Sequence, residues 1–138
     1  SGEGGERAMQ LALSTLPDGR RVSYNNAHGN STPAGDHPEI EAVRRAFAGK
    51  TQPPVSSTKS MTGHSQGAAG AQEAIYCLLM LKDDFIAPSI NVETLDPAFE
   101  AAEIATEVVE AANLDSVMTN SFGFGGTNGS MILSKYLG

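Results

Sequence analysis

The stretch from His64 to Lys82 constrains the fold of this chain more than any other. It contains an unbroken apolar run, Ala74 to Leu81, preceded by the small residues of Gly67 to Ala71. A helix that is apolar on every side is a buried helix, so we expect a central helix from about His64 to Lys82. The glycines lower its intrinsic helix propensity, and we expect them to allow close approach of another backbone. The run is far too short to cross a bilayer.

Around this helix, helical and extended patterns alternate along the chain, which indicates a layered α/β sandwich with a mixed sheet. A first helix is expected from Glu6 to about Ser14, burying Ala8, Leu11 and Ala12. Residues 101–112 predict a weaker helix or an irregular segment. Extended segments are expected at 20–27, 53–57, 85–91, 115–122 and 130–137.

A second helix is expected to begin at Asp36. Asp36 and Glu39 have the spacing of a capping box, which gives Glu39 a helix-capping role, and Gly49 is placed to end the helix. Its buried stripe is expected to contain Ile40, Val43 and Phe47.

Composition narrows the class of protein. A chain of 138 residues fits one domain, 1–138, and its net charge of −7 without a basic run argues against nucleic acids and anionic membranes. A single cysteine cannot form an internal disulfide, and no signal peptide is recognisable, so we expect a cytoplasmic protein. The chain begins without methionine and enters a helical pattern directly, which suggests a piece of a longer protein.

Residues 63–67 read G-H-S-Q-G and match the nucleophile elbow of α/β-hydrolases. The elbow requires a strand directly before the serine and a histidine after it. A loop precedes Ser65, and all three histidines, His28, His37 and His64, stand before it in the chain. We therefore interpret Ser65 as a helix N-terminal residue and keep a hydrolase only as an alternative.

The polar residues near the expected central helix suggest a different chemistry. We expect His64 to be neutral, because the helix dipole and desolvation both oppose a positive charge there. A neutral imidazole N–H can donate to a carbonyl oxygen that becomes an enolate. Lys59 lies in the loop just upstream, and His28 follows an expected strand end, where α/β folds gather their sites. The three histidines have no recognised zinc spacing, and no metal site is predicted from them.

Two side chains in or beside the apolar run need an explanation. Glu73 stands just before it, where a carboxylate needs a partner such as Lys59, an asparagine or a bound cation. Cys77 lies inside it and is interpreted as a core residue with an unreactive thiol.

The glycine-rich stretch S-F-G-F-G-G-T-N-G, residues 121–129, has three interpretations. It could cradle a phosphate, although it lacks a Walker lysine and Rossmann spacing. It could form an oxyanion hole with a backbone N–H near Phe124. It could be a hairpin turn that requires positive φ angles.

Three segments together resemble a known family. NAHGNSTPAGD, SSTKSMTGHSQGAAGAQEAIY and NSFGFGGTNG, at residues 26–36, 56–76 and 120–129, resemble the signature stretches of β-ketoacyl-acyl-carrier-protein synthases, and FIAPSIN is most similar to the type I branch of bacterial fatty-acid synthesis. The resemblance covers essentially the whole chain but only the C-terminal part of such enzymes. It implies the C-terminal half of a thiolase-like α-β-α-β-α sandwich that dimerises through its N-terminal half.

The resemblance also implies a reaction. An acyl chain rests on a cysteine, malonyl-carrier protein is decarboxylated, and the enolate attacks the thioester to give a 3-oxoacyl-carrier protein. The partner is an acyl carrier protein whose acyl and malonyl groups are phosphopantetheine-linked. His28, Lys59 and His64 match the family's catalytic residues. Lys59, together with Glu39, is expected to organise the site. Phe124 matches the gating phenylalanine, whose N–H contributes to the oxyanion hole of the acyl-transfer step.

Further residues match supporting positions of the family. Thr32 matches a threonine that binds pantetheine, while Asn30 stands where threonine is usual and is expected to bond the same arm. Asn26, Glu73 and Thr119 fall where some members hold a structural monovalent cation; no other cofactor is implied.

The chain also departs from the family. The nucleophilic cysteine is absent, because Cys77 is not at its position, and Gln66 replaces the usual leucine or methionine without an explanation. The chain is thus expected to be inert alone. A non-catalytic partner of the chain-length-factor type remains the alternative, although such partners usually lose the histidines that persist here.

Overall fold

The protein folds around a four-stranded sheet with helices on both faces. The computed structural model describes residues 3–27, 33–57, 69–88, 105, 107–122 and 128–136. The strand order is β2-β1-β5-β6, for β1 (Val22–Asn26), β2 (Val55–Ser56), β5 (Ser116–Phe122) and β6 (Asn128–Ser134). The first three strands are parallel and β6 is antiparallel to β5. The expected strands at these positions and the mixed sheet are confirmed.

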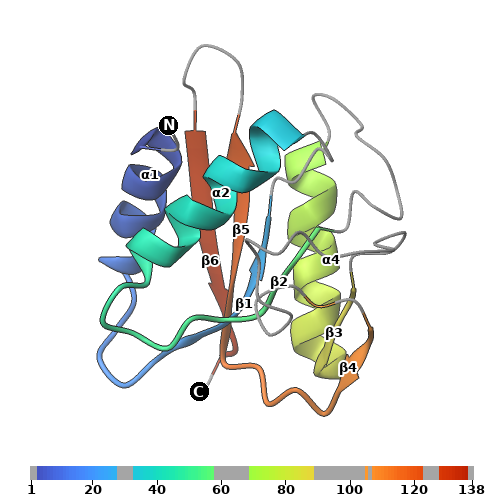
Figure 1. Cartoon of the computed structure of the whole chain (residues 1–138). Coiled ribbons are helices and arrows are strands. Elements are labelled where there is room, and N and C mark those ends of the chain that lie inside the picture. The colour runs from blue at the N-terminus through green and yellow to red at the C-terminus, as the bar shows by residue number, and fades with distance from the viewer. Residues whose placement is uncertain are drawn as a thin grey trace.

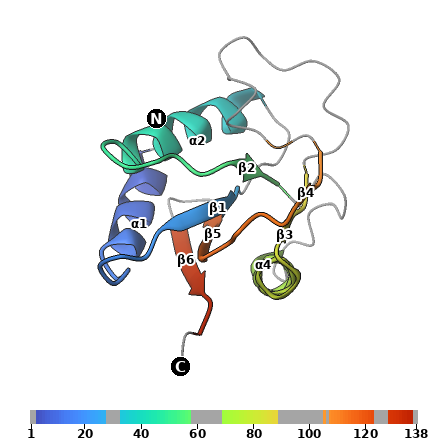
Figure 2. The same ribbon diagram turned by 90° about the horizontal axis from the view of Figure 1, so that it is seen from below.

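Two cores lie on the two faces of the sheet (Figures 1 and 2). Helices α1 (Glu3–Leu13) and α2 (Pro33–Ala46) cover one face, and α4 (Ala69–Asp83) covers the other. Because side chains alternate along a strand, β5 contributes Met118 to the α1–α2 core and Val117 to the α4 core.

Helix α1 differs from its prediction in extent and in orientation. It begins at Glu3 instead of Glu6, and it buries Gly5, Met9 and Ala12. Leu11, which we expected in the core, is 65% exposed. The local pattern is compatible with more than one apolar stripe, and packing against β6 and α2 selects the stripe that contains Met9.

Helix α2 begins at Pro33, and therefore the predicted capping box of Asp36 and Glu39 is wrong. Proline is favourable in a first helical turn because its φ is already helical and its missing N–H has no partner there. The end is as expected, since Gly49 has a φ of 79°, which glycine adopts without strain. The predicted stripe is confirmed, as Ile40, Val43 and Phe47 are all buried.

Helix α4 buries one face within this chain. Cys77, Met80 and Leu81 lie in the core against Tyr24 and Val117. The opposite face contains Ile75, Leu78 and Leu79, which are 55%, 52% and 46% exposed. Among the described residues no other layer covers this face. The expected start near His64 lies outside the described residues.

A small second sheet follows α4. Strands β3 (Phe85–Ile86) and β4 (Val109–Glu110) pair antiparallel. Residues 101–112 were expected to form a weaker helix or an irregular segment, and at their carboxyl end the helix is wrong because a short strand lies there. Asp84 accepts hydrogen bonds from the N–H groups of Asn113, at 3.0 Å, and Leu114, at 2.8 Å. These bonds fix the connection between β4 and β5, in which Ala111 and Asn113 have positive φ angles of 48° and 56°. None of the helices in the described ranges has the length and apolarity needed to cross a membrane.

An ion pair anchors the amino ends of β1 and β5. The Arg20 guanidinium lies 2.9 Å from the Asp115 carboxylate, which also accepts the backbone N–H of Arg21 at 2.9 Å. Burial alone would raise the pKa of Asp115, but the N–H of Arg21 and the charge and hydrogen bond of Arg20 outweigh it and lower the pKa below the usual range.

We expect Asp115→Asn to lower the free energy of unfolding by about 1–2 kcal/mol near neutral pH. Because the folded pKa is depressed, this stabilisation is present above the ordinary aspartate pKa of about 3.9 and is lost as the pH falls through the folded value. Urea unfolding of both proteins at neutral and strongly acidic pH measures the difference. Asp18→Asn, at an exposed loop position, is the control, and a penalty that persists in acid would contradict the assignment.

Candidate active site

The parallel strands β1 and β2 end side by side at one edge of the sheet, and β5 runs beside them and continues to Phe122. In the register of the sheet, Asn26 at the end of β1 lies opposite Ser56 of β2 and Thr119 of β5. The carboxyl ends of parallel strands are the usual location of sites in α/β folds. The candidate site therefore begins at these three positions.

Each of these strands leads along the sequence into predicted catalytic residues. His28 follows β1, Lys59 and His64 follow β2, and Phe124 lies in the connection from β5 to β6. The predicted residues that lie outside the described ranges are His28, Asn30, Thr32, Lys59, His64 and Phe124. Their roles remain predictions, as do those of Ser65 and Gln66, but the strands that deliver them are adjacent.

The predicted supporting residues of β1 and β5 do meet. The Asn26 side chain donates to the Thr119 hydroxyl at 3.2 Å, and both residues are buried. Glu73 is buried on the face of α4 that contacts these strands, and its charge contributes to raising the pKa values of Tyr24 and Cys77. The structure thus places one carboxylate and several neutral oxygens under the carboxyl edge.

This oxygen-rich set fits a hard cation of low charge better than zinc. An amide oxygen, a hydroxyl and one carboxylate are the donor types that hard cations take. In the part of the chain that the structure describes, no group of three or more His, Cys, Asp or Glu could hold a metal ion. Asn26, Glu73 and Thr119 are therefore suitable in donor type for the predicted monovalent ion.

Glu39 does not cap α2, since the helix begins at Pro33 and Glu39 lies inside it. Its side chain is buried against the core on the α1–α2 face, with 6% exposed. A buried carboxylate is retained where partners satisfy it, so this position suits the predicted role beside Lys59 better than a capping role. Lys59 itself lies outside the described residues.

A buried pair of hydroxyl groups was missed by sequence reasoning. Tyr24 Oη lies 2.6 Å from Ser56 Oγ, and Ser56 donates to the carbonyl of Ala87 at 2.5 Å. Strand alternation places Tyr24 on the same face of β1 as Asn26, which was the available signal. The partner on β2 is a long-range feature that no local pattern indicates.

The comparison with protein families agrees with this geometry. A model described as the β-ketoacyl synthase, C-terminal domain, matches residues 1–93. The chain belongs to this family. The 3-oxoacyl-[acyl-carrier-protein] synthase 1 of Haemophilus influenzae is 58% identical over 138 residues, 100% of this chain and 33% of that protein. The synthase 1 of Escherichia coli is 51% identical over 135 residues, 98% of this chain and 32% of that protein.

Solved ketosynthase structures share the fold of this β-ketoacyl synthase domain. The ishigamide ketosynthase/chain length factor matches with a TM-score of 0.88 at 35% identity, over 99% of this chain and 34% of that one. A type II polyketide ketosynthase bound to its acyl-carrier protein, AntDE:AntF, matches with a TM-score of 0.85 at 27% identity, over 99% and 34%. The thiolase-like α/β fold class is confirmed, and the chain spans about a third of the length of its curated relatives.

The single cysteine of this β-ketoacyl synthase domain is a core residue, as predicted. Cys77 is fully buried on α4. Burial raises the pKa of its thiol to about 12, and the charge of the Glu73 carboxylate adds to this increase. A hydrogen bond to Thr119 acts in the opposite direction and lowers the pKa. A thiol held in its neutral form is a poor nucleophile.

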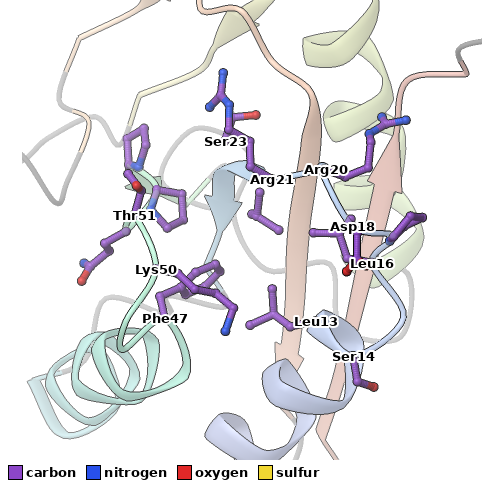
Figure 3. Close-up of a pocket in the computed structure, with 16 residues that line it drawn as sticks. Leu13, Ser14, Leu16, Asp18, Arg20, Arg21, Ser23, Phe47, Lys50 and Thr51 are labelled. Atoms are coloured by element: carbon purple, nitrogen blue, oxygen red, sulfur yellow. The ribbon is translucent and has the colours of Figure 1, made fainter.

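A separate cavity lies at the opposite, amino edge of the sheet (Figure 3). Its volume is about 760 Å³, and its lining includes Leu13, Phe47 and Lys50. Two arginines of its rim are engaged elsewhere, since Arg20 bonds Asp115 and Arg21 bonds the carbonyl of Asn113. The cavity is thus distinct from the edge where the candidate active site begins.

Proposed function

We propose that this chain is the C-terminal part of a 3-oxoacyl-acyl-carrier-protein synthase and supplies the His-His-Lys half of its site. The observation that carries the proposal is that β2, β1 and β5 are neighbours in the sheet. Along the chain, β2 leads into Lys59 and His64, β1 leads into His28, and β5 leads into Phe124. Two relatives of this chain are 3-oxoacyl-[acyl-carrier-protein] synthases 1, and this similarity supports the reaction.

In the proposed reaction, the malonyl thioester loses CO₂ as its carbon–carbon bond breaks, and the electron pair forms an enolate. The N–H groups of His28 and His64 donate to the enolate oxygen, whose charge exists only in the transition state and intermediate, so this stabilisation raises the rate. The enolate carbon then bonds to the acyl carbonyl carbon, and the thiolate of a cysteine outside this chain leaves. Lys59, with Glu39, organises the site, and the Phe124 N–H stabilises the oxyanion of the acyl-transfer step.

The proposed partner is an acyl carrier protein that presents acyl and malonyl groups on phosphopantetheine. Support comes from the names of the relatives and from the ketosynthase that is similar to this chain and was solved with its carrier protein. Thr32 and Asn30 are proposed to bond the pantetheine arm. Asn30 differs in length from the threonine that is usual at this position. We expect this difference to change the KM for the carrier-protein substrate more than it changes kcat.

The experiment is a condensation assay with the complete synthase that contains this chain. Acyl- and malonyl-carrier protein are supplied, and mass spectrometry follows the 3-oxoacyl product and CO₂ release. We expect turnover by the complete protein and none by the 138-residue chain alone. A complete protein that makes no product contradicts the proposal.

A second experiment tests the monovalent cation proposed at Asn26, Glu73 and Thr119. Thermal unfolding of the complete protein is measured in potassium chloride and in choline chloride. If the cation binds, the unfolding midpoint is higher in potassium chloride.

We also propose that the synthase is a cytoplasmic homodimer that assembles through its N-terminal half. Light scattering of the complete synthase measures its mass directly. A monomeric mass at micromolar concentration would contradict the assembly without affecting the proposed chemistry.

A further inference from the structure

A relay of hydrogen bonds joins β1, β2 and the segment after β3 below the candidate active site. Ser56 uses its proton on the Ala87 carbonyl, at 2.5 Å. Tyr24 must therefore be the donor in the 2.6 Å contact between the two hydroxyl oxygens. Ala87 is held from a second side, since its N–H donates to the sulfur of Met80 at 3.4 Å.

Packing alone does not account for the Tyr24 hydroxyl. Tyr24 is fully buried among Cys77, Val117 and other apolar side chains, where a phenylalanine would bury the same ring. Burial raises the pKa of the phenol, against the hydrogen bond to Ser56, with smaller contributions from the charges of Cys77 and Glu73. The group thus remains a neutral donor, and burying it is favourable only with a partner in hydrogen-bonding position. The hydroxyl pair adds a side-chain link between β1 and β2 to the backbone hydrogen bonds from Asn25 N–H to Pro54 and from Ala27 N–H to Ser56.

Those two strand ends are the starting points of the two histidine-bearing segments. His28 follows β1 and His64 follows β2 along the chain. We propose that Tyr24 and Ser56 are positioning residues of the condensation reaction, which hold these two segments in a fixed relation through the 2.6 Å hydroxyl contact. The inference rests on the proposed function, because it assigns the pair a role in aligning His28 and His64.

The test replaces single oxygen atoms in the complete synthase. Tyr24→Phe is expected to lower kcat for condensation roughly tenfold, since small misplacements of catalytic groups are costly, with KM for malonyl-carrier protein changed less than about twofold. Acyl transfer to the nucleophilic cysteine, measured in a single turnover, is expected to stay at the wild-type rate. Ser56→Ala is expected to act similarly, and the double variant no worse than the stronger single one, because the two groups act as one unit.

A matched control exists at the other end of the sheet. Ser116 and Ser134 make a hydroxyl contact of the same 2.6 Å length between β5 and β6. Ser134→Ala is expected to keep the wild-type kcat even where its loss of thermal stability equals that of Tyr24→Phe. Two results would overturn the positioning role and leave the proposed function intact. One is an equal loss of kcat in Ser134→Ala and Tyr24→Phe. The other is a Tyr24→Phe variant with full condensation activity. A wild-type synthase without condensation activity would overturn both.

Discussion

Replacement of His28 or His64 by alanine in the complete synthase is expected to lower condensation by about 10²- to 10³-fold, since each removes one donor to the enolate oxygen. The double variant is expected to lose less than the product of the two single losses, because the two donors act on one atom. Product formation under saturating acyl- and malonyl-carrier protein is the measurement. Acylation of the nucleophilic cysteine is measured beside it, and we expect it to be affected much less.

The third histidine provides the control for this prediction. His37 lies in α2 and matches none of the predicted catalytic positions, so His37→Ala is expected to retain the wild-type rate. Ser65→Ala tests the hydrolase alternative: an esterase activity that disappears in this variant would favour the serine, and we expect none. A complete protein that makes no condensation product, with or without His28 and His64, would instead favour a non-catalytic partner of the chain-length-factor type.

A lysine in place of Leu78 is expected to have opposite effects in two settings. In the complete synthase, where we predict α4 to be the central helix, Leu78→Lys buries a charge and is expected to cost roughly 3 kcal/mol of unfolding free energy. In the 138-residue chain Leu78 is half exposed, together with Ile75 and Leu79, so the same change is expected to cost little and to reduce self-association. Thermal unfolding measures the first effect, and gel filtration with hydrophobic-dye binding measures the second.

Tyr136→Lys is the control for the Leu78 variant, because Tyr136 is 94% exposed. It is expected to leave the stability of the complete synthase unchanged. Equal stability losses for the two substitutions, or none for Leu78→Lys, would show that this face of α4 is not covered in the complete protein.

The sequence predicted the strands better than the helices. The extended segments expected at 20–27, 53–57 and 115–122 correctly indicated β1, β2 and β5, and β1 and β2 are buried along their whole length. The stripe of α1 was assigned wrongly, with Leu11 placed in the core, because that helix has several small apolar residues and only its neighbours select the face that is buried. The capping box at Asp36 failed for a similar reason, since Pro33 offered an earlier start.

By itself, the sequence was sufficient for the family and the α/β class, because these depend on motifs and on periodicity within single segments. It predicted a helix buried on all sides, whereas in this chain one face of α4, with Ile75, Leu78 and Leu79, is about half exposed. The residues of the site stay predictions. The tertiary structure decided which strands are neighbours and which buried polar groups meet. Asn26 bonds Thr119, 93 residues away, and Tyr24 bonds Ser56, 32 residues away. Contacts of that separation depend on how the whole sheet assembles, so no local pattern encodes them.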